Sequence, residues 1–90
     1  MLISQLFNNI TVVTVTHNSE NVITSFSDSL DQRFNLCVID NASQDNTVKL
    51  IEDFHNDKIR LLKRKSNKGY SNSVNKAVKV ATFENILILN

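Results

Sequence analysis

The sequence predicts an α/β fold in which a parallel β-sheet is covered by helices on both faces. Short apolar runs alternate with longer segments whose apolar residues recur at helical spacing, in the strict order strand, helix, strand, helix, strand, helix, strand. The apolar runs are continuous, as expected of strands that are buried on both faces of a parallel sheet. Such alternation implies right-handed crossovers between parallel strands.

The first strand is predicted from Ile10 to Val15, where the sequence ITVVTV consists entirely of β-branched residues. A helix from about Glu20 to Gln32 follows, and Asn18 or Ser19 can cap its N-terminus. The apolar stripe of this helix consists of Val22, Ile23, Phe26 and Leu30. Their spacing puts them on one face, which predicts a helix that packs against the sheet.

The second strand is predicted from Leu36 to Ile39, and a polar turn begins directly after it at Asp40. Ser43 is a favourable N-cap for the next helix, which we expect from about Asp45 to His55. Asp45 lies where a first-turn carboxylate favours the positive end of the helix dipole. The inward-facing positions of this helix are Val48, Ile51 and Phe54.

A short third strand is predicted from Ile59 to Leu62. Gly69, the only glycine of the chain, then precedes the third helix. The apolar positions of that helix are Tyr70, Val74, Ala77, Val78 and Ala81. The last apolar run, from Ile86 to Leu89, predicts a fourth strand.

Composition limits the chain to one small domain, because 90 residues rarely build two hydrophobic cores. The net charge of +1 gives no general argument for nucleic acid or an anionic membrane as partner. Cys37 is the only cysteine, which excludes an intrachain disulfide and a cysteine-based zinc site, and its apolar context predicts a core residue. We see neither a signal-peptide pattern nor a run of about 20 apolar residues, and we expect a reduced, cytoplasmic environment.

Asp40 is the first candidate ligand-binding residue. An acid at the carboxyl end of a parallel strand can accept hydrogen bonds from a nucleobase imide or a ribose hydroxyl. It can equally cap the turn that follows it. Asp45 has the same two interpretations, because first turns of helices favour acids. The residue types alone leave both interpretations open.

The segment from Ser66 to Tyr70, SNKGY, places the lone glycine directly before a helix. Gly69 permits a positive φ or a close approach to a ligand, and the helix N-terminus with Lys65 or Lys68 beside it can face a phosphate. A plain turn explains the same residues. Neither GxxxxGK[ST] nor GxGxxG occurs, which disfavours P-loop and dinucleotide-binding folds.

Basic residues cluster around the third strand, at Lys58, Arg60, Lys63, Arg64, Lys65 and Lys68. No aromatic residues are interleaved with them, so the cluster indicates a solvated sheet edge rather than a nucleic-acid surface. His17 and His55 lie far apart in the predicted layout and have no third ligand, which argues against a metal site on them.

Four segments in this order resemble the family-2 glycosyltransferases, most closely their bacterial rhamnosyltransferase-like branch. They are VTVTHNS (Val13–Ser19), VIDNASQDNT (Val38–Thr47), SNKGYSNSVNKAV (Ser66–Val78) and ILILN (Ile86–Asn90). The resemblance covers about Ile10 to Asn90. It implies an A-type glycosyltransferase fold, whose three-layer, Rossmann-like sheet has the strand order 3-2-1-4. It also implies binding of a nucleoside-diphosphate sugar donor for transfer to an acceptor hydroxyl, typically with inversion.

The resemblance assigns site residues as well. Contacts with the base and ribose are implied for Thr14, Thr16 and Asn18, and recognition of the base for Asp40. The turn beside that acid matches at Asn41, Ser43 and Asp45. A pattern that lines the sugar-nucleotide pocket matches at Asn67, Gly69 and Asn75. The chain departs from the family pattern at His17, where tyrosine is frequent, and at Ser73 and Ala77, where glycine is frequent.

Asn90 matches the first position of an acidic triplet that binds a divalent cation, Mg²⁺ or Mn²⁺, in the family. The acid that would hold the metal and the general base of the acceptor half have no match in this sequence, and an inverting transfer needs both. We therefore expect residues 1–90 to form a single truncated nucleotide-sugar-binding domain that lacks the acceptor half and is inactive alone. The cation is expected only in the full-length enzyme. The acceptor implied is a glycan or a lipid-linked molecule, and the location implied is the cytoplasm, including the inner face of the membrane.

The segment from Ile86 to Leu89 forms an uncovered apolar edge strand in this strand order. Bare edges favour pairing with another chain, so we expect self-association through this segment. The main alternative function is a non-catalytic α/β module that binds a nucleotide or a partner protein. A receiver-like signalling domain is disfavoured, because the first strand ends in Thr-His-Asn rather than in paired acids.

Overall fold

The computed structural model describes residues 7, 9–80 and 85–89. The strands in this part of the chain are β1 (Ile10–Thr16), β2 (Asn35–Asn41), β3 (Ile59–Arg64) and β4 (Asn85–Leu89). The helices between them are α2 (Glu20–Ser29), α3 (Thr47–Glu52) and α4 (Tyr70–Val80). All strand pairs are parallel and the order is β3-β2-β1-β4, which confirms the predicted sheet.

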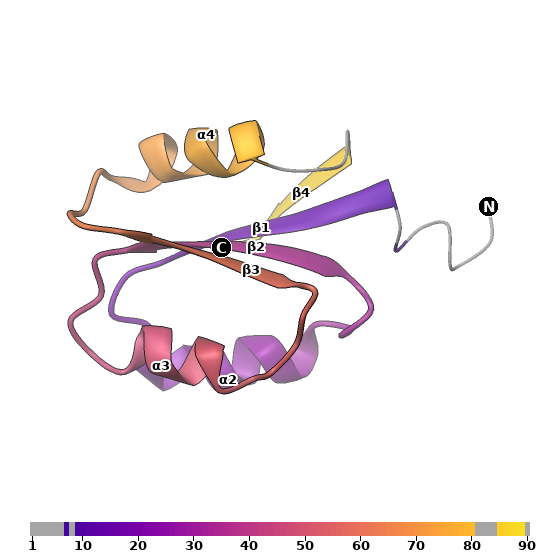
Figure 1. The fold of residues 1–90 in the computed structure, drawn as a ribbon, viewed down its shortest axis with the longest axis horizontal. Helices are drawn as coiled ribbons and strands as arrows, with labels where there is room; N and C mark the ends of the chain where they lie inside the picture. Colours follow the sequence, from indigo (N-terminus) through magenta and orange to yellow (C-terminus); the bar gives the residue numbers. More distant parts are fainter. Residues whose placement is uncertain (1–6, 8, 81–84, 90) are drawn as a thin grey trace.

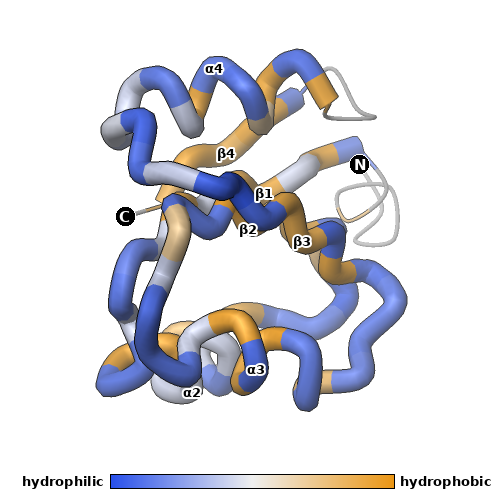
Figure 2. Tube along the Cα trace, turned by 60° about the vertical axis from the view of Figure 1, so that its left-hand side comes forward, coloured by the Kyte–Doolittle hydropathy of each residue, from blue (hydrophilic) through white to orange (hydrophobic). Residues whose placement is uncertain are grey.

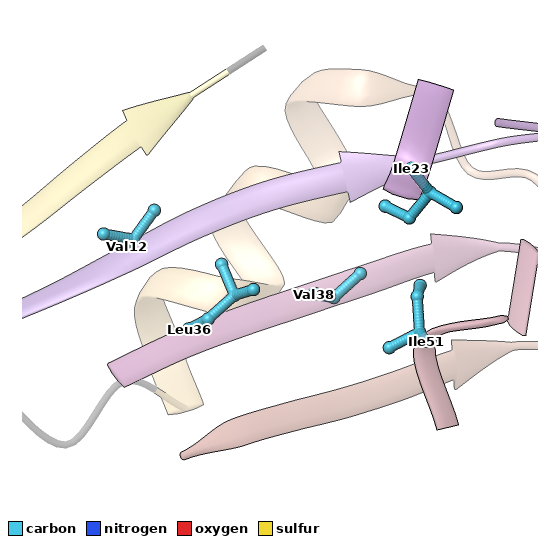
Figure 3. Close-up of a cluster of buried hydrophobic side chains, with 5 residues drawn as sticks. All are labelled: Val12, Ile23, Leu36, Val38 and Ile51. Atoms are coloured by element: carbon cyan, nitrogen blue, oxygen red, sulfur yellow. The ribbon is translucent and has the colours of Figure 1, made fainter. Parts of the chain in front are cut away.

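The sheet separates two helical layers: α2 and α3 lie against one face, and α4 lies against the other (Figure 1). Alternation of side chains along each strand supplies apolar residues to both layers. On the first face, the buried cluster consists of Val12, Ile23, Leu36, Val38 and Ile51 (Figure 3). On the α4 face, the buried cluster consists of Val13, Cys37, Ile39 and Ala77.

Cys37 lies in the core, as predicted. Desolvation raises the pKa of its thiol, an effect that the charge of Arg60 opposes in part. The connections between the sheet and the helices are mostly hydrophilic, whereas the strands at the centre of the sheet are mostly apolar (Figure 2). None of the helices described is long and apolar enough to cross a membrane.

The first helix, α2, is shorter than the sequence predicts. It ends at Ser29 rather than Gln32, because Leu30 leaves the helical conformation with φ −90° and ψ 133°. Ser19 occupies the N-cap position, but its side chain makes no capping hydrogen bond. The predicted cap is therefore correct in position and wrong in mechanism.

The second helix, α3, spans Thr47–Glu52 instead of the predicted Asp45–His55. Its N-cap position is Asn46, so the prediction that Ser43 caps this helix is wrong. Beyond the C-terminus, His55 has a φ of 50°, a left-handed conformation that a continuing α-helix does not tolerate. Phe54 continues the apolar spacing past the C-terminus of α3, which explains the longer prediction at that end.

The face of the third helix, α4, that packs against the sheet differs from the face predicted from its apolar residues. Ser73 and Ala77 are fully buried, whereas Tyr70 and Val78 are 48% and 44% exposed. Ala81 lies outside the described residues. Because Ser73 and Ala77 are small and four positions apart, they let the helix backbone approach the sheet closely.

Strand β4 lies at one edge of the sheet and pairs with β1. Its consecutive residues Leu87 and Ile88 point to opposite faces, as they do in any strand. They are 46% and 43% exposed, whereas Ile86 and Leu89 are partly buried against the two core clusters, so the described residues cover each face of β4 only in part. The sequence prediction of an uncovered apolar edge is thus correct for Leu87 and Ile88.

Candidate functional site

The candidate site lies at the carboxyl ends of β1 and β2, where the loops to α2 and α3 begin. Strand alternation divides its residues between the two faces of the sheet. Thr14, Thr16 and Asp40 share the parity of Val12 and Val38, which face α2 and α3. Asn41 has the opposite parity and faces α4.

Asp40 is 1% exposed and forms the centre of a hydrogen-bonded turn. Its Oδ1 accepts a hydrogen bond from the hydroxyl of Thr16 on β1 and another from the hydroxyl of Ser43, both at 2.6 Å. Its Oδ2 accepts a third from the backbone N–H of Ser43 at 2.9 Å. A carboxylate offers about four acceptor positions, so one on Oδ2 is left. The side chain therefore caps its own turn and fixes that turn to β1.

Asn18 joins the loop after β1 to the loop after β2 in both directions. Its backbone N–H donates to the Ser43 hydroxyl oxygen at 2.8 Å, and its Oδ1 accepts from the backbone N–H of Gln44 at 2.8 Å. Asn18 and Ala42 both have a positive φ, 48° and 54°. Asparagine adopts that conformation more readily than most residues, so its presence in this tight loop has a backbone reason.

Asp45 lies at the N-termini of two helices. One carboxylate oxygen accepts from the backbone N–H and the hydroxyl of Thr47, at the start of α3. The other accepts from the backbone N–H of Glu20, the first residue of α2, at 3.2 Å. Desolvation on its own would raise the pKa of Asp45, but the hydrogen bonds from Thr47 and Glu20 together lower it. The prediction that Asp45 lies in the first turn of the second helix is wrong, because α3 begins at Thr47 after the N-cap Asn46. Its carboxylate nevertheless accepts hydrogen bonds at the starts of two helices.

A second set of contacts lies on the α4 face and connects Asn41 to the start of α4. The hydroxyl of Ser73 donates to Oδ1 of Asn41, and Nδ2 of Asn41 donates to the carbonyl of Gly69 at 3.4 Å. Gly69 has a φ of 84° and its backbone N–H donates to Oδ1 of Asn67 at 2.8 Å. A Cβ at Gly69 would meet nothing within 4 Å, so the glycine is needed for its φ and not for a close approach.

The predicted residues are not all brought together. Eight of the ten predicted site residues belong to the two sets of contacts described above. Thr14 is buried in β1 on the face that α2 covers. Thr14 and Thr16 line a cavity of about 160 Å³ between β1 and α2. Asn75 is exposed on α4, two positions from the buried Ser73 and so on nearly the opposite side of the helix.

Three residues without an assigned site role contribute to the arrangement. Nδ1 of His17 donates to the carbonyl of Asn41 at 2.6 Å. Thr47 is fully buried, and its hydroxyl oxygen accepts from the backbone N–H of Ser19 at 2.7 Å. Ser73 is the third. Helical spacing was available as a signal for Ser73, since it lies one turn before Ala77.

The described residues do not fit the divalent cation that the family resemblance implies. No group of three or more His, Cys, Asp or Glu side chains among them is arranged to hold a metal ion. Asp40 and Asp45 use their oxygens on hydroxyl and backbone donors. Asn90, the position matched to the metal-binding triplet, lies outside the described residues.

The topology itself defines a class of protein. The strand order reverses at β1, because β2 and β3 follow on one side of it and β4 pairs on the other. In open parallel α/β sheets, ligands bind in the crevice outside the carboxyl ends of the strands at such a point. The molecule is an open, parallel α/β domain with such a reversal point.

The family follows from comparison with known proteins. The sequence model of Glycosyl transferase family 2 matches residues 11–90. Because the match covers most of the chain, the chain belongs to this family, which makes it glycosyltransferase-like. No curated protein sequence matches the chain at a significant level.

Proposed function

We propose that this chain provides the nucleotide-sugar-binding part of a family-2 glycosyltransferase. The observation that carries the proposal is the pair of cross-linked loops at the point where the strand order reverses. Their internal hydrogen bonds hold the loop backbone before any ligand arrives. A binding site that is ordered in advance avoids the entropic cost of ordering on binding.

The site residues fall into two proposed roles. Exposed polar groups at this edge, on Asn18, Asn67 and Gly69, contact the donor directly. The buried or half-buried residues that bond one another hold the loops in position, and they are Thr16, Asp40, Asn41, Ser43 and Asp45. Thr14 and Asn75 stay proposed contacts by family resemblance alone.

Transfer of the sugar requires groups that the described residues do not present. We propose that the cation, Mg²⁺ or Mn²⁺, and the general base belong to parts of the enzyme outside them, so that residues 1–90 on their own bind the donor without transferring it. The inverting outcome, the rhamnosyltransferase-like branch and a glycan or lipid-linked acceptor are further proposals from the resemblance. The same holds for action in the cytoplasm at the inner face of the membrane and for self-association through β4.

Calorimetric titration with UDP, dTDP and GDP, with and without Mn²⁺, tests the proposal. We expect saturable binding of one of the three diphosphates. Asn18→Gly keeps the positive φ and removes the side chain together with its hydrogen bond to Gln44, and it should weaken binding about tenfold. Asn72→Ala, an exposed asparagine on α4 outside the matched pattern, is the control. A folded chain that binds none of the three contradicts the proposal.

Asn75→Ala against the same Asn72→Ala control decides whether Asn75 belongs to the site. Both asparagines are exposed on α4, so the two substitutions change helix propensity equally. Weaker binding in Asn75→Ala alone supports the assignment of Asn75 to the donor site by family resemblance. Equal affinity in the two variants removes Asn75 from the site.

A further inference from the structure

A basic groove lies outside the candidate site, between the end of β3 and α4. Its volume is about 450 Å³. The cations that line it are Lys63, Arg64, Lys65, Lys68 and Lys76. None of the described lining residues is acidic. The chain as a whole carries ten Lys and Arg against nine Asp and Glu, so this concentration is a local feature and does not follow from the net charge.

Topology explains why residues from two elements meet here. Arg64 is the last residue of β3 and pairs with Asn41, which faces α4. Leu62 pairs with Ile39 and packs in the cluster beneath α4. Leu62 and Arg64 of β3 therefore point toward α4. Helix α4 in turn contributes Lys76 to the lining of the groove.

Arg64 provides a second, independent observation. Its Nη1 atom is buried and has no hydrogen-bond partner in the part of the chain that the structure describes. An unsatisfied buried donor costs about 1–3 kcal/mol, and more for a charged group. A rotation of the side chain that turned the guanidinium toward the groove would allow two parallel hydrogen bonds with a phosphate and would remove this cost. A purely solvated basic edge, the interpretation that the sequence favours, does not account for a buried guanidinium nitrogen.

Among the residues that the structure describes, carboxylates do little to neutralise the surrounding cations. The one ion pair recorded for a groove residue joins Lys63 to Glu52 at 4.0 Å, and both side chains are more than half exposed, so its contribution is small. The other basic residues near β3 are used differently: Lys58 donates to the carbonyl of Arg33, and Arg60 donates to the carbonyl of Val80.

We propose that this groove binds a phosphate-bearing anion, with Arg64 as the principal contact. No aromatic ring is among the described lining residues, so the groove offers no stacking platform for the bases of a nucleic acid. Its concave shape suits a compact phosphate group. The groove borders Asn67 and Gly69 of the candidate site, but none of its described lining residues belongs to the cross-linked loops after β1 and β2. The proposal therefore goes beyond the donor contacts proposed above by adding a cationic groove on the α4 side of β3.

Titration with inorganic pyrophosphate, followed by NMR of the backbone amides, is the first test. Shifts are expected in residues 62–68 and around Lys76, and not in residues 16–19 or 42–45. Arg64→Gln should weaken binding about tenfold, since it removes a charge-assisted hydrogen bond. Lys49→Gln removes the same charge from α3, on the other side of the sheet, and is the control. Affinity should fall at high salt.

The outcome for Arg64→Gln separates binding from folding. Because the guanidinium nitrogen is unpaired, the melting temperature of this variant should equal or exceed that of the parent chain. Lys76→Gln, an exposed position on α4, serves as a second variant and should also weaken pyrophosphate binding. Absence of binding, or an equal loss in Arg64→Gln and Lys49→Gln, overturns the proposal.

A parallel measurement identifies the source of the phosphate. Sedimentation with phosphatidylglycerol vesicles, against phosphatidylcholine vesicles, tests a lipid headgroup. Arg64-dependent sedimentation that pyrophosphate competes away assigns the groove to anionic lipid. Pyrophosphate binding without sedimentation assigns it to a free phosphate compound. Shifts at residues 16–19 alone would place the anion at the donor site and overturn the proposal for the groove.

Discussion

At the scale of single residues, the most informative side chain is the carboxylate of Asp40. Three internal hydrogen bonds satisfy it, and two of them come from the hydroxyls of Thr16 and Ser43. Asp40→Ala would leave these donors without their acceptor inside the protein. We expect a loss of about 2–4 kcal/mol in the free energy of unfolding, measured by urea denaturation. A loss below about 0.5 kcal/mol, typical of surface substitutions, would contradict this structural role.

Asp45 gives a prediction about pH. Its pKa is lowered in the folded chain because the hydrogen bonds from Thr47 and Glu20 outweigh desolvation. A depressed folded pKa stabilises the protein above the unfolded value of about 4, and the stabilisation is lost as the pH falls through the lower folded value. Asp45→Asn should therefore reduce the acid dependence of unfolding between about pH 5 and pH 2. Asp31, whose pKa is lowered to about 2 by hydrogen bonds from Arg33, stays in both proteins, so the difference isolates Asp45. Identical acid dependence of unfolding in the parent chain and in Asp45→Asn would contradict a lowered pKa of Asp45 in the folded chain.

The sequence predicts which residues matter at this edge better than it predicts what they do. Asp40 and Asp45 each had two interpretations, and the structure demonstrates hydrogen-bonded support of turns and helix starts for both. Ser43 belongs to the hydrogen-bonded turn after β2 but does not cap α3. The capping of α2 by Asp45 and the bond from Ser19 to Thr47 join residues more than 20 positions apart, and local sequence patterns carry no information about such contacts.

At the scale of elements, α4 shows how size decides packing. Ala77 is fully buried against Val13, Cys37 and Ile39. Ala77→Leu adds volume where the helix backbone lies close to the sheet, and we expect a loss of about 1–3 kcal/mol in the free energy of unfolding. Val78→Leu, one residue later at a position 44% exposed, is the control and should change stability by less than about 0.5 kcal/mol. Equal effects of the two substitutions would place the contact face along the apolar stripe instead.

The strands were easier to predict than the helices for a physical reason. A strand buried on both faces is mainly apolar, so its centre is easy to locate, as at Leu36–Ile39. Its end is not, because β2 continues through the buried polar residues Asp40 and Asn41. A helix needs only one apolar stripe, and that stripe continues into flanking turns that also pack on the sheet. Phe54, beyond the end of α3, packs against the core in this way. Small buried residues such as Ser73 carry no hydropathy signal.

At the scale of the whole molecule, strict alternation was enough to predict a parallel sheet. It was not enough to order the strands, and the order β3-β2-β1-β4 came from the family resemblance before the structure confirmed it. That order places β4 at an edge beside β1. It also places the reversal point at β1, so that the proposed donor site at the ends of β1 and β2 lies beside it. The exposure of β4 and the position of the site are consequences of the same topology.

The last prediction concerns that edge. Among the described residues β4 pairs with β1 alone, and its outer backbone groups are available to a strand of a second copy. Leu87 and Ile88 expose apolar surface on opposite faces, so side chains of a paired strand would lie beside both and bury part of each. We expect concentration-dependent association by light scattering. Ile88→Lys should reduce it, since charges on edge strands oppose pairing. Val22→Lys removes an apolar side chain that is 62% exposed on α2, and it should leave association unchanged. A monodisperse monomer at high concentration would exclude this role for β4, whereas equal loss in both variants would point to general apolar attraction.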